Sequence, residues 1–104
     1  MKKIGKYFQV RTDLSRSGRQ PNLELLNLLK LNKRKALYST AELVDLTGLK
    51  KTTLRRYLEK VPVAERRLEG RQYINFYNVD DCIALASELK EFLDAGLRVM
   101  IKSD

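Results

Sequence analysis

Residues 38–61 read YSTAELVDLTGLKKTTLRRYLEKV, and they contain two short amphipathic segments on either side of a glycine. Ser39 is followed three residues later by Glu42, which is the spacing of a capping box and predicts a helix start at Ser39. Gly48 can adopt the positive φ that ends a helix, and the leucines beyond it recur at helical spacing. The stretch therefore predicts two helices joined by a tight turn that contains glycine.

The sequence on either side adds four further elements. Upstream, Asn22 is a candidate cap for a leucine-rich helix, and residues 36–38 are long enough only for a short strand. Downstream, alternating apolar and polar residues over 63–77 predict a β-hairpin with its tip at Glu69-Gly70. A last helix is predicted from Asn78 to about residue 101, with a bend at its internal glycine.

Composition excludes several classes of protein. The 104-residue chain has 21 Lys and Arg, 13 Asp and Glu, a net charge of +8, no His and one Cys. The missing His removes the commonest general base and metal ligand, and one Cys cannot form a thiolate cage or an internal disulfide. We therefore expect no enzyme activity, no metal and no cofactor. Since the sequence lacks a signal peptide and any long apolar run, we also expect a cytoplasmic protein without membrane contacts.

The positive charge is concentrated in two parts of the chain. Residues 1–20 carry six basic and one acidic residue, and residues 50–72 carry eight and three. Residues 73–104 are acidic, with three basic and six acidic residues. Such segregation favours a polyanionic partner, since neutralising phosphates releases counterions. A solvated lysine-rich surface is the alternative, so local structure has to decide between them.

The order of predicted elements resembles the winged helix-turn-helix of DNA-binding regulators over residues 22–95. The stretch YSTAELVDLTGLKKTTLRRYLEK is similar both to the MarR/PadR-type recognition unit and to the MerR-type signature of Glu-Leu, Thr-Gly and Leu-Arg-x-Tyr. The leucine-rich helix ahead of it favours the MarR/PadR form, because a MerR-type domain begins at the helix that starts at Ser39. MerR-type activators also carry a long coiled coil and a sensor segment, for which residues 79–104 leave no room. Plasmid partition-site binding proteins share this shape.

The resemblance implies an α+β, mainly helical fold, namely a winged helix-turn-helix with a C-terminal dimerisation helix. We assign a basic flexible arm, a winged domain and a dimerisation helix to residues 1–20, 21–78 and 79–104. The implied function is sequence-specific binding of double-stranded DNA as a homodimeric transcriptional repressor. The alternatives are a plasmid or chromosome partition (centromere-binding) or DNA-coating protein that recruits a further partner protein, and a winged helix that binds protein or RNA.

The second helix of the pair carries the first group of candidate DNA contacts. If Leu54 and Leu58 face the core, the opposite face is exposed near the N-terminus of the helix, where major-groove readers place their base contacts. Arg55 and Arg56 are the candidates for guanine, and the neighbouring threonines for phosphate or a thymine methyl group. A solvated face is the alternative, although it lacks the acids that would pair with these cations. The group comprises Lys50, Lys51, Thr52, Thr53, Arg55 and Arg56.

The hairpin carries the second group. Arg66, Arg67 and Arg71 are candidates for the minor groove or its phosphates, as the wing of the resembled family implies. Glu65 and Glu69 offer the alternative of a purely structural wing, in which they pair with those arginines.

The starts of the two central helices are the third candidate region. Ser39 and Thr40 could bind a phosphate through backbone N–H groups, although a capping role alone is the simpler explanation. Lys50 stands where the resembled families place a Ser or Thr cap, so either the helix begins later or a phosphate supplies its cap. Tyr57 either packs half-buried or reaches DNA, and packing is favoured.

The two ends of the chain are assigned different roles. The N-terminal arm either embraces DNA or is a disordered tail, and its basic residues are Lys2, Lys3, Lys6, Arg11, Arg16 and Arg19. Apolar residues cover more than one side of the last helix, so one side suits a partner helix from a second subunit, with packing inside a monomer as the alternative. The dimerisation residues predicted on it are Leu85, Leu89, Phe92 and Leu93. Cys82 is expected to be a small core residue.

Overall fold

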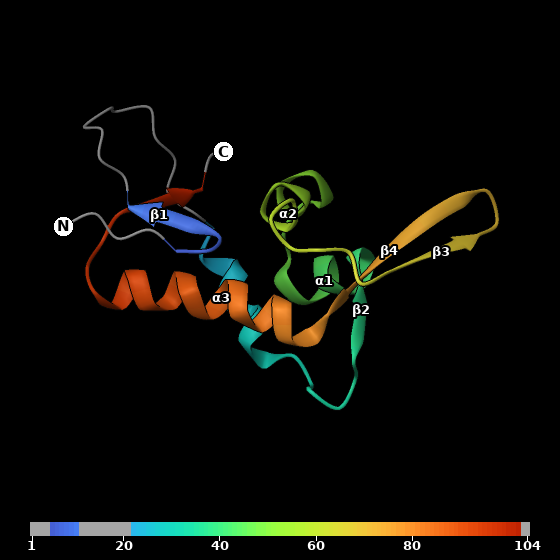
Figure 1. Ribbon diagram of the computed structural model, residues 1–104, viewed down its shortest axis with the longest axis horizontal. Coiled ribbons are helices and arrows are strands. Elements are labelled where there is room, and N and C mark those ends of the chain that lie inside the picture. Colours follow the sequence, from blue (N-terminus) through green and yellow to red (C-terminus); the bar gives the residue numbers. More distant parts are fainter. Residues whose placement is uncertain (1–4, 11–21, 103–104) are drawn as a thin grey trace.

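The structure is a computed structural model that describes residues 5–10 and 22–102 (Figure 1). It contains two antiparallel sheets, one with the strand order β1-β5 and one with the order β2-β4-β3. The elements in chain order are β1 (Phe8–Val10), the 3-10 helix η1 (Leu23–Lys30), β2 (Leu37–Ser39), α1 (Thr40–Thr47), α2 (Lys51–Leu58), β3 (Glu65–Glu69), β4 (Gln72–Asn78), α3 (Val79–Asp94) and β5 (Val99–Ile101).

The central helices α1 and α2 form as the sequence predicts. The Ser39 hydroxyl accepts a hydrogen bond from the Glu42 N–H at 3.2 Å, and the Glu42 carboxylate accepts one from the Ser39 N–H at 3.1 Å, which completes the capping box. Gly48 ends α1 with a φ of 74°, in the left-handed region that favours glycine. The predicted pair of helices with a glycine turn is confirmed.

One hydrophobic core joins α3 and η1 to the inner faces of α1 and α2. The long helix α3 lies below α1 and α2 and crosses η1, and β1 and β5 close one end of the molecule (Figure 1). Side chains with no exposed surface come from every one of these helices and from β1, and they are Phe8, Leu25, Leu28, Leu43, Leu54, Cys82, Ala86 and Leu89.

The strands β3 and β4 form a hairpin that projects away from this core (Figure 1). Gly70 adopts a φ of 62° at the tip, and the register pairs Glu69 with Gln72. Every residue of β3 is exposed, whereas β4 runs from exposed Gln72 to buried Tyr77 at its base. Since β4 also pairs with β2, the hairpin is anchored at one end and reaches into solvent at the other.

The leucine-rich segment is a 3-10 helix with Asn22 at its N-cap position, but the expected capping hydrogen bond from the Asn22 side chain is not formed. Leu25 and Leu28 are both fully buried, and a spacing of three places them on one side of a 3-10 helix. The Asn22 amide oxygen accepts a hydrogen bond from the Tyr57 hydroxyl at 3.1 Å, and the Asn22 N–H donates to that hydroxyl at 3.0 Å. Asn22 therefore links η1 to α2 through these hydrogen bonds. Tyr57 packs in the core, which is the alternative that the sequence favoured over a contact with DNA.

The last helix ends at Asp94, so the prediction that it continues to residue 101 is wrong. Gly96 has a φ of 74°, its N–H donates to the Leu93 carbonyl, and the Leu97 N–H donates to the Phe92 carbonyl. This is the hydrogen-bond pattern of a Schellman motif, which stops a helix. The chain beyond it forms β5, which pairs with β1.

The prediction of a flexible N-terminal arm is wrong for residues 7–10. Tyr7 and Phe8 are buried, and residues 8–10 form the strand that pairs with β5. The Glu88 carboxylate on α3 accepts hydrogen bonds from the backbone N–H groups of Lys6, Tyr7 and Phe8 at 2.6 to 2.7 Å. These charge-assisted bonds hold the segment on α3.

Candidate nucleic-acid interface

The helix α2 turns its polar side away from the core. Leu54, Tyr57 and Leu58 are buried, which fixes the rotation of the helix about its own axis. At about 100° per residue, Thr52 and Arg56 then lie directly opposite Leu54, and both are exposed. The ring of Phe8 packs against Tyr57 from behind, with 6.3 Å between the ring centroids. The exposed face of α2 is therefore backed by the hydrophobic core.

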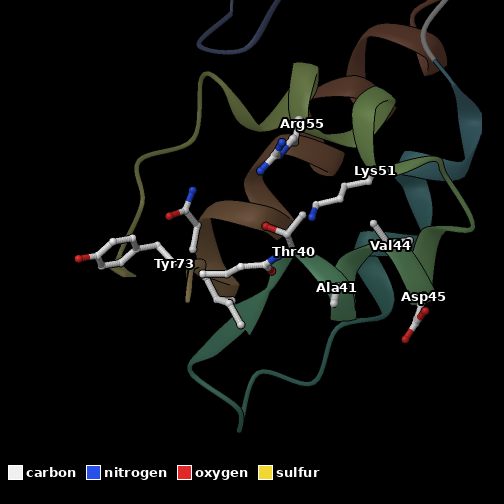
Figure 2. Close-up of a pocket in the computed structure, with 10 residues that line it drawn as sticks. Thr40, Ala41, Val44, Asp45, Lys51, Arg55 and Tyr73 are labelled. Carbon is white, nitrogen blue, oxygen red and sulfur yellow. The ribbon is translucent and has the colours of Figure 1, made fainter. Parts of the chain in front are cut away.

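A concavity of about 340 Å³ lies between α1, α2 and β4 (Figure 2). The Lys51 ammonium and the Arg55 guanidinium both point into it, toward Thr40 at the start of α1, whereas the Asp45 carboxylate points away (Figure 2). Among residues 5–10 and 22–102, neither cation forms an ion pair. Residues Gln72, Tyr73, Ile74 and Asn75 of β4 form the opposite wall. Two unpaired cations facing a hydroxyl are suited to holding an anion.

The starts of α1 and α2 differ in what they can offer a ligand. The Ser39 hydroxyl is engaged in the capping box, and Glu42 lies beside it. A hydrogen bond from Lys35 lowers the pKa of the Glu42 carboxyl, which keeps a negative charge at this helix end. By contrast, α2 begins at Lys51, and no side chain caps it. Lys50 lies at the N-cap position as an exposed residue, so a cap supplied by a phosphate stays a prediction.

Two of the three hairpin arginines lie over aromatic rings of β4. The Arg66 guanidinium is 4.6 Å from the ring centroid of Tyr73, and that of Arg67 is 4.5 Å from the ring centroid of Phe76. Arg67 also pairs with Glu65 at 2.6 Å, so the structural alternative for the wing applies to this arginine. Stacking of this kind orders a guanidinium while its N–H groups stay able to donate.

The third hairpin arginine, Arg71, lies at the tip beside Gly70. Its side chain is exposed, and no carboxylate in the described part of the chain pairs with it. Among the described residues, Arg71 is therefore the hairpin arginine with neither a carboxylate partner nor an aromatic ring beneath it.

The residues predicted to contact a second subunit lie in the core of the chain itself. Leu85, Leu89 and Phe92 retain at most 2% of their surface, and Leu93 is partly buried against the same core. They pack against segments distant in sequence, including η1 and β1. The predicted dimer seam is therefore wrong for Leu85, Leu89 and Phe92.

The remaining candidates do not line the concavity. Thr53 is half-buried, and Lys6 is exposed near α3, on a different part of the surface from the concavity. The other arm residues, Lys2, Lys3, Arg11, Arg16 and Arg19, lie outside the described residues.

The acidic helix α3 carries no candidate for chemistry. Burial, with a smaller contribution from Asp81, raises the pKa of the Cys82 thiol to about 12, so it stays protonated in the core.

Over residues 5–10 and 22–102, no group of three or more Cys, Asp or Glu side chains is placed to hold a metal ion. None of the helices in these same segments has the length and apolar character needed to cross a membrane.

Sequence reasoning missed the residues of β4 that line the concavity. Gln72, Tyr73 and Asn75 were assigned only to a strand, although strand alternation places Tyr73 and Asn75 on one side of it. No local signal gives the angle between the hairpin and α2, and this angle creates the concavity.

The comparison with protein families identifies this arrangement. Residues 38–99 of the chain match the protein family described as MerR HTH family regulatory protein. The match starts in β2 and covers α1, α2, the hairpin and α3, while β1 and η1 precede it. No curated protein and no solved structure gave a significant match. The match supports DNA-binding transcription regulation and does not extend to the MarR/PadR likeness. The chain thus belongs to the MerR HTH family of regulatory proteins.

Proposed function

We propose that this protein is a repressor that occupies a specific duplex DNA sequence, with α2 in the major groove and the hairpin against the neighbouring backbone. The observation that carries the proposal is the convergence of Lys51 and Arg55 with Thr40 in the concavity between α2 and β4. This concavity joins the exposed face of α2 to the hairpin. One duplex can therefore contact both elements.

The exposed face of α2 is assigned the base contacts. Arg55 and Arg56 are the proposed readers of guanine, because a guanidinium can donate to guanine O6 and N7 together. Thr52, which lies beside Arg56 on the outward face, is proposed to contact a phosphate or a thymine methyl group. Thr53 is proposed to contribute less to DNA binding, because its side chain is half-buried.

The cations around this face are assigned the phosphate contacts. Lys50 and Lys51 precede and begin α2, where the helix N-terminus also favours an anion. Thr40 faces the concavity, whereas the Ser39 hydroxyl already accepts the capping hydrogen bond. We therefore assign the phosphate contact at the start of α1 to Thr40. On the hairpin, Arg66, Arg67 and Arg71 are proposed to hold the flanking backbone.

The homodimer predicted from the sequence stays a prediction. Its contact cannot be formed by Leu85, Leu89 or Phe92, since these side chains are already buried. Sedimentation of the full chain at tens of micromolar, with and without DNA, distinguishes a dimer in solution from copies that assemble on the duplex.

The test is selection from a random pool of DNA duplexes with the full chain, followed by footprinting on an enriched sequence. A single bounded footprint, and lower transcription in vitro from a promoter that overlaps it, supports repression. A regular ladder of protected segments would instead indicate a partition or DNA-coating protein. Weak binding without any enriched sequence would contradict the proposal and favour the protein- or RNA-binding alternative.

A further inference from the structure

The two sides of the β3–β4 hairpin differ in charge. Side chains alternate along each strand, and the register of the pair then fixes which residues share a side. One side carries Arg66, Leu68, Tyr73 and Asn75, and we call it the acid-free side. The other side carries both acidic residues of the hairpin strands, and it consists of Glu65, Arg67, Glu69, Gln72, Ile74 and Phe76.

The acid-free side displays an apolar pair to solvent. Leu68 and Tyr73 are directly opposite each other in the register, and they are 59% and 61% exposed. Arg66 lies over the Tyr73 ring, so a cation adjoins the pair. Large apolar side chains opposite each other on a hairpin that projects from the core indicate a contact with another molecule.

This surface is continuous with the concavity. Tyr73 and Asn75 belong to the acid-free side and also line the concavity that holds Lys51 and Arg55. The Tyr73 ring extends outward from it, away from α1 and α2 (Figure 2). Gln72 and Ile74 of the other side line the concavity as well, and Tyr73 is the residue that links the concavity beside α2 to the exposed apolar pair.

We propose that Leu68 and Tyr73 pack against the deoxyribose walls of the minor groove that flanks the sequence contacted by α2. This rests on the proposed function. The charge fits, because the acid-free side brings Arg66 and no carboxylate toward the phosphates. Apolar side chains pack well in a minor groove, and a narrow groove attracts arginine.

A second copy of this chain is the other candidate for this surface. Pairing through the exposed edge of β3 would leave the face that carries Leu68 and Tyr73 uncovered. A partner of this face meets Arg66 and no carboxylate, which favours a polyanion. The sedimentation measurement below tests for a second copy.

The test uses the full chain on one duplex enriched from the random pool, with two chemical probes. Hydroxyl-radical cleavage reports which deoxyriboses are covered, and dimethyl sulfate reports which guanine N7 atoms in the major groove are covered. The variants are Leu68→Ser and Tyr73→Ser, and Leu23→Ser is the control, because Leu23 is a leucine of similar exposure (60%) that does not line the concavity. All three positions are exposed, so the urea midpoint should not change.

The proposal predicts that Leu68→Ser and Tyr73→Ser lose the deoxyribose protection in the flanking minor groove while guanine protection persists at saturation. Affinity should fall on the order of tenfold for each, without a change in the salt slope, because the lost contact is apolar. Leu23→Ser should match the wild type.

Three results would overturn the proposal. The first is unchanged deoxyribose protection in both variants while guanine protection persists, which leaves the proposed function intact. The second is an equal loss of protection and affinity in the control Leu23→Ser. The third is a variant that lowers the sedimentation coefficient without changing the footprint, since a second copy would then cover this surface. If no duplex is enriched at all, the proposed function itself fails.

Discussion

The helix α3 and the β3–β4 hairpin both carry apolar side chains at regular spacing, yet the fold uses them in opposite ways. On α3, Leu85, Leu89 and Phe92 are buried by segments distant in the sequence. On the hairpin, Leu68 and Tyr73 remain about 60% exposed. An apolar stripe predicts that one face of a helix is buried, but it does not show whether the same chain or a partner buries it. Surface that this chain leaves uncovered is a better guide to a binding partner.

The largest effect is expected from an acid placed in α3. Leu89→Asp puts an uncompensated charge at a position with no exposed surface, so the chain should lose more than about 5 kcal/mol of stability and unfold. Circular dichroism and urea unfolding measure this. The same substitution in the hairpin, Leu68→Asp, is the control and should leave the fold intact. A folded Leu89→Asp monomer would contradict the buried position of α3.

The next effect concerns alkaline pH and the buried thiol of α3. Because burial raises the pKa of Cys82 from 9.0 to about 12, the unfolded chain loses this proton first as the pH rises. The free energy of unfolding should therefore fall between pH 9 and about 12, by up to about 1.4 kcal/mol per pH unit from this group. The control Cys82→Ala lacks this contribution, and urea unfolding of both proteins measures the difference. If the free energy of unfolding fell equally steeply with pH in both proteins, the Cys82 thiol would be exposed to solvent.

On the DNA-facing side, Arg55→Ala should leave stability unchanged and weaken binding. If Arg55 reads guanine, the loss is about 1–3 kcal/mol on the selected duplex and much less on random DNA. Arg98→Ala removes the same charge at an exposed position between α3 and β5, and it should have little effect. Fluorescence anisotropy on both duplexes measures this. An equal loss on both would make Arg55 a phosphate contact and move the coating alternative ahead of repression.

The smallest effect is expected at the hairpin tip. Arg71→Ala should weaken binding to selected and random duplexes in similar proportion and lower the slope of log affinity against log salt by about one. This is the signature of one phosphate contact. Together with Leu68→Ser, which should keep the slope, it separates ionic from apolar contacts on one hairpin. An unchanged slope in Arg71→Ala would show that the tip does not contact DNA.

The elements whose ends are determined by neighbouring residues could be predicted from the sequence. The capping box of Ser39 and Glu42, the glycine stop at Gly48 and the hairpin tip at Gly70 all lie within a few residues of what they determine. The exposed face of α2 followed from its buried leucines.

The errors arose where the cause lies far away in the sequence. The end of α3 at Asp94 depends on a Schellman turn at Gly96 and on the pairing of β5 with β1, which joins the two ends of the chain. The burial of α3 depends on η1 and on the Glu88 hydrogen bonds to residues 6–8. The concavity depends on how the hairpin is set against α2, for which the sequence carries no local signal.

The most direct test of the account is a titration of the ¹⁵N-labelled chain with the selected duplex, followed by NMR. The account predicts that the amide signals of α2, the start of α1 and residues 66–75 of the hairpin shift, while those in the middle of α3 and in β5 do not. Shifts centred on α3 and β5, with α2 and the hairpin unchanged, would contradict it.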